Sequence, residues 1–197
     1  MIRRLAALLL ALAMTFPAAA LAASQNVADL PGGTYVLDRK HSSVIARAAH
    51  LGVSLYTVRF DAFEADFSYD PAHPQAAQVR ATIDATSMDV GADYSRRFAD
   101  EFLDAGKFPK ITFVSRQIGP GVGRSGTMTG ELTLRGVTAP VTFDVTFNGV
   151  GKGLFGGTVS GFTAVATIKR SDFGSTFLQN VVGDEVRIEI EAEFDRK

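Results

Sequence analysis

The most informative absence in this 197-residue sequence is cysteine, of which there is none. Without cysteine the chain cannot form disulfides, use a thiol in catalysis, bind a metal through thiolates or carry a lipoprotein anchor. Clusters of Lys and Arg are also missing, and the formal net charge is only −1. Because nucleic-acid binding depends on such clusters, the composition argues against a nucleic-acid partner.

Long hydrophobic runs are absent except at the N-terminus. There, Arg3 and Arg4 precede an apolar run over residues 5–16, and residues 20–22 (Ala-Leu-Ala) provide the small side chains of a cleavage site. This pattern is typical of a secretory signal peptide, and its apolar core is too short to span a bilayer. We therefore expect residues 1–22 to be removed and the mature protein to be exported, periplasmic or secreted, by either the general secretory or the twin-arginine route.

The rest of the chain indicates an arm followed by one domain. Residues 23–33 are polar and contain Pro and Gly, which is typical of an irregular segment. Residues 34–197 have the length of one all-β domain and are numerous enough to bury a substantial core without disulfides.

Apolar and polar residues alternate through most of this domain. The clearest example is residues 130–147, where the alternation continues on both sides of a short break that contains Gly136 and Pro140. A period of two with β-branched and aromatic residues predicts antiparallel strands that are apolar on one face, and the Gly and Pro predict a tight connection. The same period recurs in residues 43–48, 78–85, 162–168 and 185–194.

Helical periodicity is confined to residues 93–103, where Tyr94, Phe98 and Phe102 recur at every fourth position. That spacing predicts one short helix. About eight strands in one domain predict either a β-sandwich or a closed barrel, and the alternation does not separate the two.

The run LTLRGVTAPV at residues 132–141 resembles the signature turn of the YceI-like family of polyisoprenoid-binding proteins. This resemblance implies an all-β fold, an eight-stranded antiparallel lipocalin-like barrel with one short helix, and binding of an isoprenoid lipid. It extends over most of the mature chain through further motifs in the family's order: Tyr35-x-x-Asp38-x-x-His41-Ser42, His50-Leu51-Gly52-Val53-Ser54, Ser87-Met88-Asp89, Phe102-Leu103-Asp104, Lys107-Phe108-Pro109, Arg170-Ser171-Asp172-Phe173-Gly174 and Val182-Gly183-Asp184-Glu185-Val186.

A barrel of this strand number is either filled by its own side chains or able to hold one small ligand. Several residues expected to point inward are small, namely Ala46, Ala48, Ala81, Ala85, Ala164 and Ala166. They either leave a cavity or face large partners such as Phe143 and Phe162 in a solid core, and the resemblance favours the cavity. The residues expected to contact a lipid are Val44, Ala46, Ala48, His50, Phe60, Phe63, Phe67, Ala81, Ile83, Phe113, Leu134, Phe143, Phe162, Ala164 and Phe173.

The sequence contains no convincing catalytic site. Ser42 lies next to His41 and near Asp38, but adjacency in sequence does not create the geometry of a nucleophile and its base. No G-x-S-x-G motif is present either. We therefore expect no catalytic residue and interpret Asp38 and His41 as partners for backbone groups in a bend between strands.

The three histidines are not spaced as metal ligands, so we expect neither a metal site nor a required cofactor. His73 lies in a predicted surface turn, and His41 and His50 would fall on opposite faces of one strand. His50 follows the inward Ala48. Its imidazole would then bond either the polar head of a ligand or a buried backbone group, and both interpretations remain open.

The glycine-rich segment 149–157 lacks the pattern of a phosphate-binding loop, but it presents Leu154 and Phe155. This pair either tucks under the barrel rim or forms a mobile lip at the barrel mouth that contacts a membrane. The second interpretation makes Leu154 and Phe155 the candidate membrane-contact residues.

Together these observations predict an exported, non-enzymatic protein that holds a long isoprenoid lipid, such as a quinone or polyprenol derivative, for storage or transport. Its expected partners are the apolar lipid and, transiently, a membrane, and a homodimer is left open. The alternatives are an exported enzyme that modifies such a lipid and a stress-protective protein with a filled core.

Overall fold

The computed structural model describes residues 23–119 and 121–197, so the expected signal peptide lies outside the described residues. Within these ranges the chain forms strand segments joined by tight turns and a single α-helix. The elements are β1 (Gly33–Leu37), β2 (Ser43–His50), β3 (Ser54–Phe60), β4 (Phe63–Tyr69), β5 (Gln78–Asp84), β6 (Met88–Asp89), α1 (Ser95–Leu103), β7 (Lys110–Gly119), β8 (Ser125–Leu134), β9 (Val137–Lys152), β10 (Thr158–Lys169) and β11 (Val182–Arg196).

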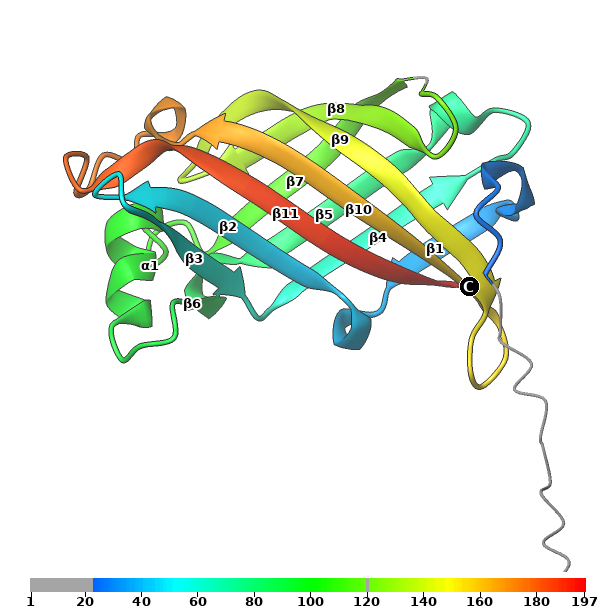
Figure 1. The fold of residues 1–197 in the computed structure, drawn as a ribbon, viewed down its shortest axis with the longest axis horizontal. Helices are drawn as coiled ribbons and strands as arrows, with labels where there is room; N and C mark the ends of the chain where they lie inside the picture. Colours follow the sequence, from blue (N-terminus) through cyan, green and yellow to red (C-terminus); the bar gives the residue numbers. More distant parts are fainter. Residues whose placement is uncertain (1–22, 120) are drawn as a thin grey trace, which may run out of the picture.

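The segments combine into eight long antiparallel strands that close on themselves (Figure 1). β1 and β2 lie end to end along β11, while β3 continues into β4 and β5 into β6. β7, β8, β9 and β10 each pair with the next strand in the chain, and the pairing of β1 with both β11 and β4 closes the ring. The structure therefore confirms the predicted eight-stranded barrel and excludes the sandwich.

The alternation in the sequence sets the register of the barrel. Ala164 of β10 lies opposite Val145 of β9 and Ile190 of β11, so these residues share the inward face. The neighbouring residues on β11, Glu189 and Glu191, fall on the outward face. A shift by one residue would exchange the two faces, which is why the pattern determines the register so strongly.

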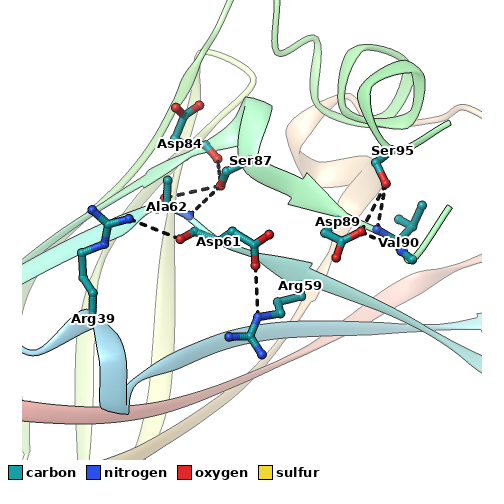
Figure 2. Close-up of polar contacts among 10 residues, drawn as sticks. Arg39, Arg59, Asp61, Ala62, Asp84, Ser87, Asp89, Val90 and Ser95 are labelled. Carbon is teal, nitrogen blue, oxygen red and sulfur yellow. Dashed lines mark hydrogen bonds and ion pairs between the residues drawn. The ribbon is translucent and has the colours of Figure 1, made fainter. Parts of the chain in front are cut away.

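Polar contacts join the break between β3 and β4 to the break between β5 and β6 (Figure 2). The Ser87 hydroxyl accepts a hydrogen bond from the Ala62 amide at 3.0 Å and donates one to the Asp84 carbonyl at 2.7 Å. Nearby, the Ser95 hydroxyl accepts from the Val90 amide at 3.1 Å. These contacts hold the bent strands together and tie the start of α1 to the end of β6.

The helix α1 covers one end of the barrel, which we call the α1 end (Figure 1). It spans Ser95–Leu103, inside the predicted range 93–103, and confirms the predicted short helix. The rings of Tyr94, Phe98 and Phe102 follow one another along it, with centroids 4.7 and 5.4 Å apart. Within the described ranges, no helix combines the length and the apolar character needed to span a bilayer.

The opposite end of the barrel is filled by an aromatic cluster, and we call it the aromatic end. The Tyr35 and Phe67 rings stack with centroids 4.5 Å apart, and Phe67 meets Phe194 edge-on at 4.9 Å. Phe162 packs against both Phe67, at 5.6 Å, and Phe147, at 5.4 Å. Ring contacts of this kind add stability beyond the burial of apolar area.

Candidate functional site, an apolar cavity in the barrel

A cavity of about 780 Å³ lies inside the barrel between these two ends. Side chains from all eight strands and from α1 line it, and most of them are apolar. Its volume falls within the range of roughly 300–1,000 Å³ that is usual for ligand pockets in proteins. The barrel is therefore hollow, and Ala46, Ala48, Ala81 and Ala164 line its cavity.

Fourteen of the fifteen residues predicted to contact a lipid line this cavity, although the contact itself stays a prediction. Phe173 is the exception, and we correct that expectation. It is 2% exposed and packs in the core, but β10 ends at Lys169, so the alternation does not carry Phe173 to the cavity wall. Of the small alanines, Ala85 and Ala166 are likewise buried without lining the cavity.

A few polar side chains lie together at the α1 end of the cavity. Sequence analysis does not identify the main one, Tyr56. Tyr56, Val58 and Phe60 occupy every second position of β3, so all three point inward. The Tyr56 hydroxyl is buried and makes no fully formed hydrogen bond among the described residues. Burial, and to a smaller extent a weak hydrogen bond to the Tyr94 side chain, raises the pKa of Tyr56 to about 12. The His50 ring lies 6.1 Å from the Tyr56 ring.

Arg170 also borders the cavity at this end, but backbone carbonyls already occupy its N–H donors. Its Nε donates to the Gly183 carbonyl at 3.0 Å and its Nη2 to the Val182 carbonyl at 2.9 Å. Its Nη1 donates to the carbonyls of Ser175 and Phe177, both at 2.9 Å. Arg170 is only 6% exposed, so it serves to fix the loop between β10 and β11 and not to bind an anion.

The Ser, His and Asp residues considered for catalysis hold the bend between β1 and β2. The Ser42 hydroxyl donates to the Asp38 carbonyl at 2.7 Å and accepts from the Glu193 amide at 2.9 Å. The Asp38 carboxylate accepts from the Lys40 amide and pairs with His41 Nδ1, both at 2.8 Å. The predicted use of Asp38 in the bend is confirmed. Asp38, His41 and Glu193 each offer one atom that could bind a metal ion, and these three atoms lie within 4.8 Å of one another.

The electrostatics of this bend follow from the Asp38–His41 hydrogen bond. That bond is the main cause that raises the pKa of His41, and the charges of Asp38 and Glu193 add to it. The same bond, together with the Lys40 amide, lowers the pKa of Asp38. None of these side chains lines the cavity, so they belong to the outside of the barrel.

Leu154 and Phe155 form the tip of the β9–β10 hairpin and are 82% and 100% exposed. The interpretation in which they tuck under the rim is therefore excluded. A second exposed apolar group lies on and beside the β2–β3 turn at the α1 end, where Leu51, Val53 and Leu55 are 60%, 81% and 65% exposed. The two ends of the barrel thus each present apolar side chains to the solvent.

Comparison with known proteins identifies the relatives of this chain. The model of the YceI-like domain matches residues 35–194. A UPF0312 protein of Pseudomonas putida is 36% identical over 166 residues, which cover 82% of this chain and 84% of the relative. A UPF0312 protein of Vibrio vulnificus is 38% identical over 169 residues, which cover 83% of this chain and 84% of the relative.

Solved structures share the fold. BcnA of Burkholderia cenocepacia is 31% identical, with a TM-score of 0.72 over 80% of this chain and 98% of BcnA. A polyisoprenoid binding domain from Saccharophagus degradans is 17% identical, with a TM-score of 0.64 over 83% of this chain and 98% of that domain, and shows the likeness of fold alone. Because the family model spans almost the whole barrel and the relatives exceed one-third identity, this chain belongs to the family of YceI-like domains.

Proposed function

We propose that this protein holds a long isoprenoid lipid inside its barrel for storage or transport between membranes. The observation that carries the proposal is the apolar cavity of about 780 Å³, which is lined from end to end by inward side chains of the barrel. The Saccharophagus degradans domain with the same fold is described as polyisoprenoid-binding, which supports a ligand of this class.

The energetics of such a ligand indicate how the protein must work. Burying apolar carbon from water contributes about 0.8 kcal/mol per CH₂ group, so a long isoprenoid is hardly ever free in water. In a membrane the tail is already buried, and moving it into the apolar cavity gains little. Discrimination between lipids then depends on the shape of the cavity and on contacts with the head group, and exchange takes place at a membrane surface.

The proposed place of action is the exported compartment, the periplasm or the cell exterior, and the proposed membrane contact is the pair Leu154 and Phe155. The signal-peptide pattern of residues 1–22 supports export. The near-complete exposure of both side chains on a glycine-rich hairpin supports the membrane contact. Sequencing the N-terminus of the protein recovered from the periplasm tests export, and a full-length chain retained in the membrane fraction would contradict it.

Identification of the lipid that co-purifies from the native host tests the binding function. Mass spectrometry of the organic extract is expected to show an isoprenoid in the wild-type protein. Ala46→Phe places a ring in the cavity, because Ala46 lines it, and is expected to reduce the amount of bound lipid. Thr57→Phe is the matched control, since Thr57 is exposed on the outer face of the neighbouring strand.

Three outcomes would contradict this proposal. Recovery of wild-type protein with no isoprenoid, or with equal amounts in Ala46→Phe, would indicate that the cavity does not hold such a lipid. Incubation of the protein with a polyprenol should return the lipid unchanged. A chemically altered product that is lost on substitution of His50 would favour an enzyme instead.

A further inference from the structure

The N-terminal arm, residues 23–33, packs against the aromatic end of the barrel, beside the base of the β9–β10 hairpin (Figure 1). Leu30 is 4% exposed and packs among the rings that fill this end, and Val27 packs beside it. Both side chains also line the cavity. The arm therefore forms part of the cavity wall at the aromatic end.

Among the described residues, few hydrogen bonds attach the first part of the arm to the barrel. Ser24 and Val150 of β9 exchange both of their backbone hydrogen bonds, each at 2.8 Å, and form an isolated bridge. The Tyr35 hydroxyl donates to the Pro31 carbonyl at 2.6 Å. The Ser24 hydroxyl donates within the arm itself, to the Asp29 carboxylate at 2.5 Å. The arm is thus held mainly by the burial of its apolar side chains.

The strand pairing of the barrel does not depend on this part of the arm. The pairing of β1 begins at Gly33, opposite Tyr69 of β4. Gly33 has a φ of 149°, a conformation that favours glycine, and it follows Gly32 directly. Arg196 Nε fixes this point by donating to the Gly32 carbonyl at 2.8 Å. Residues 23–31 can therefore detach from a glycine hinge while every pairing between strands stays intact.

The start of the arm is joined to the hairpin that is the proposed membrane contact. Val150, which bonds Ser24, lies on β9 shortly before the exposed hairpin tip. Ala23 lies against the same strand, because a Cβ atom added at Gly151 would be 3.6 Å from the Ala23 Cβ atom. A movement of the hairpin therefore acts directly on the first residues of the arm.

We propose that the arm is a strap that closes the aromatic end of the cavity and detaches at a membrane, so that a lipid passes beneath it. In water, burial of Leu30 and Val27 against the rings favours the closed strap. At a bilayer these side chains can enter hydrocarbon instead, so the membrane favours the open state. This proposal rests on the proposed lipid-binding function and membrane contact, and it adds the conformational step between them.

A disulfide between the strap and β9 tests the closure, and the chain has no native cysteine to interfere. In Ala23→Cys/Gly151→Cys, made without residues 1–22, the Cβ separation of 3.6 Å suits a disulfide. Oxidation should slow the transfer of tritiated geranylgeraniol between phosphatidylcholine vesicles by about tenfold or more, because the open state is no longer populated. Reduction of the disulfide should restore the transfer.

The matched control is a disulfide in the same hairpin that leaves the strap free. Asn148→Cys/Gly161→Cys joins β9 to β10, with a Cβ separation of 3.5 Å. It also replaces one glycine, and it crosslinks two strands that are already paired. Its rate of transfer should be the same when it is oxidised and when it is reduced.

Thiol labelling measures the opening itself, without any lipid ligand. Leu30→Cys places a thiol in the buried part of the strap, and Ala85→Cys places one in the core cluster to which the strap does not belong. Phosphatidylcholine vesicles should speed the reaction of Leu30→Cys with a water-soluble maleimide by about tenfold or more and leave Ala85→Cys protected. Adding Leu154→Ser/Phe155→Ser to Leu30→Cys should remove this acceleration.

Four results would overturn the strap. Equal transfer by the oxidised and the reduced Ala23→Cys/Gly151→Cys protein would show that lipid passes elsewhere, while lipid binding itself would stand. Equal labelling of Leu30→Cys with and without vesicles would show that the strap stays closed. Faster labelling of both Leu30→Cys and Ala85→Cys would indicate opening of the whole barrel. If the wild type transfers no geranylgeraniol, the lipid-binding function fails, and the passage of a lipid beneath the strap fails with it.

Discussion

The two ends of the barrel differ in how closely their aromatic rings pack. At the aromatic end, the Tyr35 and Phe67 rings stack with centroids 4.5 Å apart, and both residues are buried. At the α1 end, Tyr94 is 47% exposed and Phe98 is half-buried. Each end also buries one hydroxyl without a fully formed hydrogen bond among the described residues, Tyr56 at the α1 end and Ser160, opposite Phe194, at the aromatic end. The contrast therefore lies in the packing. Close packing favours stability, whereas looser packing leaves side chains available to a ligand.

The strand pairing explains why the two ends differ. At the aromatic end, β1 pairs with both β4 and β11, so backbone hydrogen bonds continue around the wall. At the α1 end, β6 pairs with β3, and α1 lies between β6 and the start of β7. The wall at the α1 end is thus completed by a helix and by a loop that Arg170 fixes, whereas a continuous sheet forms the wall at the aromatic end.

Truncation of one ring at each end provides the largest expected effect. Phe67→Ala should lower the free energy of unfolding by about 3–5 kcal/mol, because it removes a buried ring in contact with three others. Phe98→Ala should cost less, about 1–2 kcal/mol, because Phe98 is only half-buried. Chemical denaturation of both variants measures the difference, and equal losses would show that both ends contribute alike to stability.

The sequence predicted the parts of this contrast that depend on local patterns. The alternation around Leu134 and Phe143 is visible within a few residues, and it placed both on the cavity wall correctly. Tyr56 follows the same rule with Val58 and Phe60, so the alternation on β3 also indicates its inward direction. Phe173 was placed wrongly because a tight turn, Arg170–Phe173, ends the alternation of β10 before it reaches that residue.

Other features could not be predicted because they depend on segments that are distant in the chain. Whether the Tyr56 hydroxyl meets a partner depends on where α1 packs, and no local pattern determines that position. The approach of Glu193 to His41 results from the pairing of the first and last strands around the closed barrel. Local alternation does not reveal how a sheet closes, so contacts across that closure appear only in the structure.

Two pairs of exposed apolar residues allow the ends to be compared as membrane contacts. Two double variants test this, Leu154→Ser/Phe155→Ser and Leu51→Ser/Val53→Ser. Each should change the free energy of unfolding by no more than about 0.5 kcal/mol, because all four side chains are mostly exposed. We expect only the Leu154 and Phe155 pair to slow transfer of a prenol between vesicles. Slower transfer in the Leu51 and Val53 pair alone would move the membrane contact to the α1 end.

The smallest expected effect is a pH dependence confined to the bend that holds β1 and β2 to β11. The raised pKa of His41 means that its contribution to stability is fully present below the unfolded value of about 6.5 and is lost as the pH rises through the folded value. The lowered pKa of Asp38 means that its contribution is present above about 3.9 and is lost as the pH falls through the folded value. Both contributions are therefore present together only between about pH 4 and pH 6.5.

The difference in melting temperature between the wild type and His41→Gln should consequently be largest at about pH 5 to 6, where both contributions are present. It should shrink toward about pH 9, where His41 is neutral. The difference should be small at every pH, because His41 is exposed. Glu193→Gln removes the second carboxylate, 3.7 Å from the His41 ring, and should reduce the pH dependence without abolishing it. A difference that stays constant from acid to alkaline pH would mean that the bend is held by the Ser42 and Asp38 backbone hydrogen bonds alone.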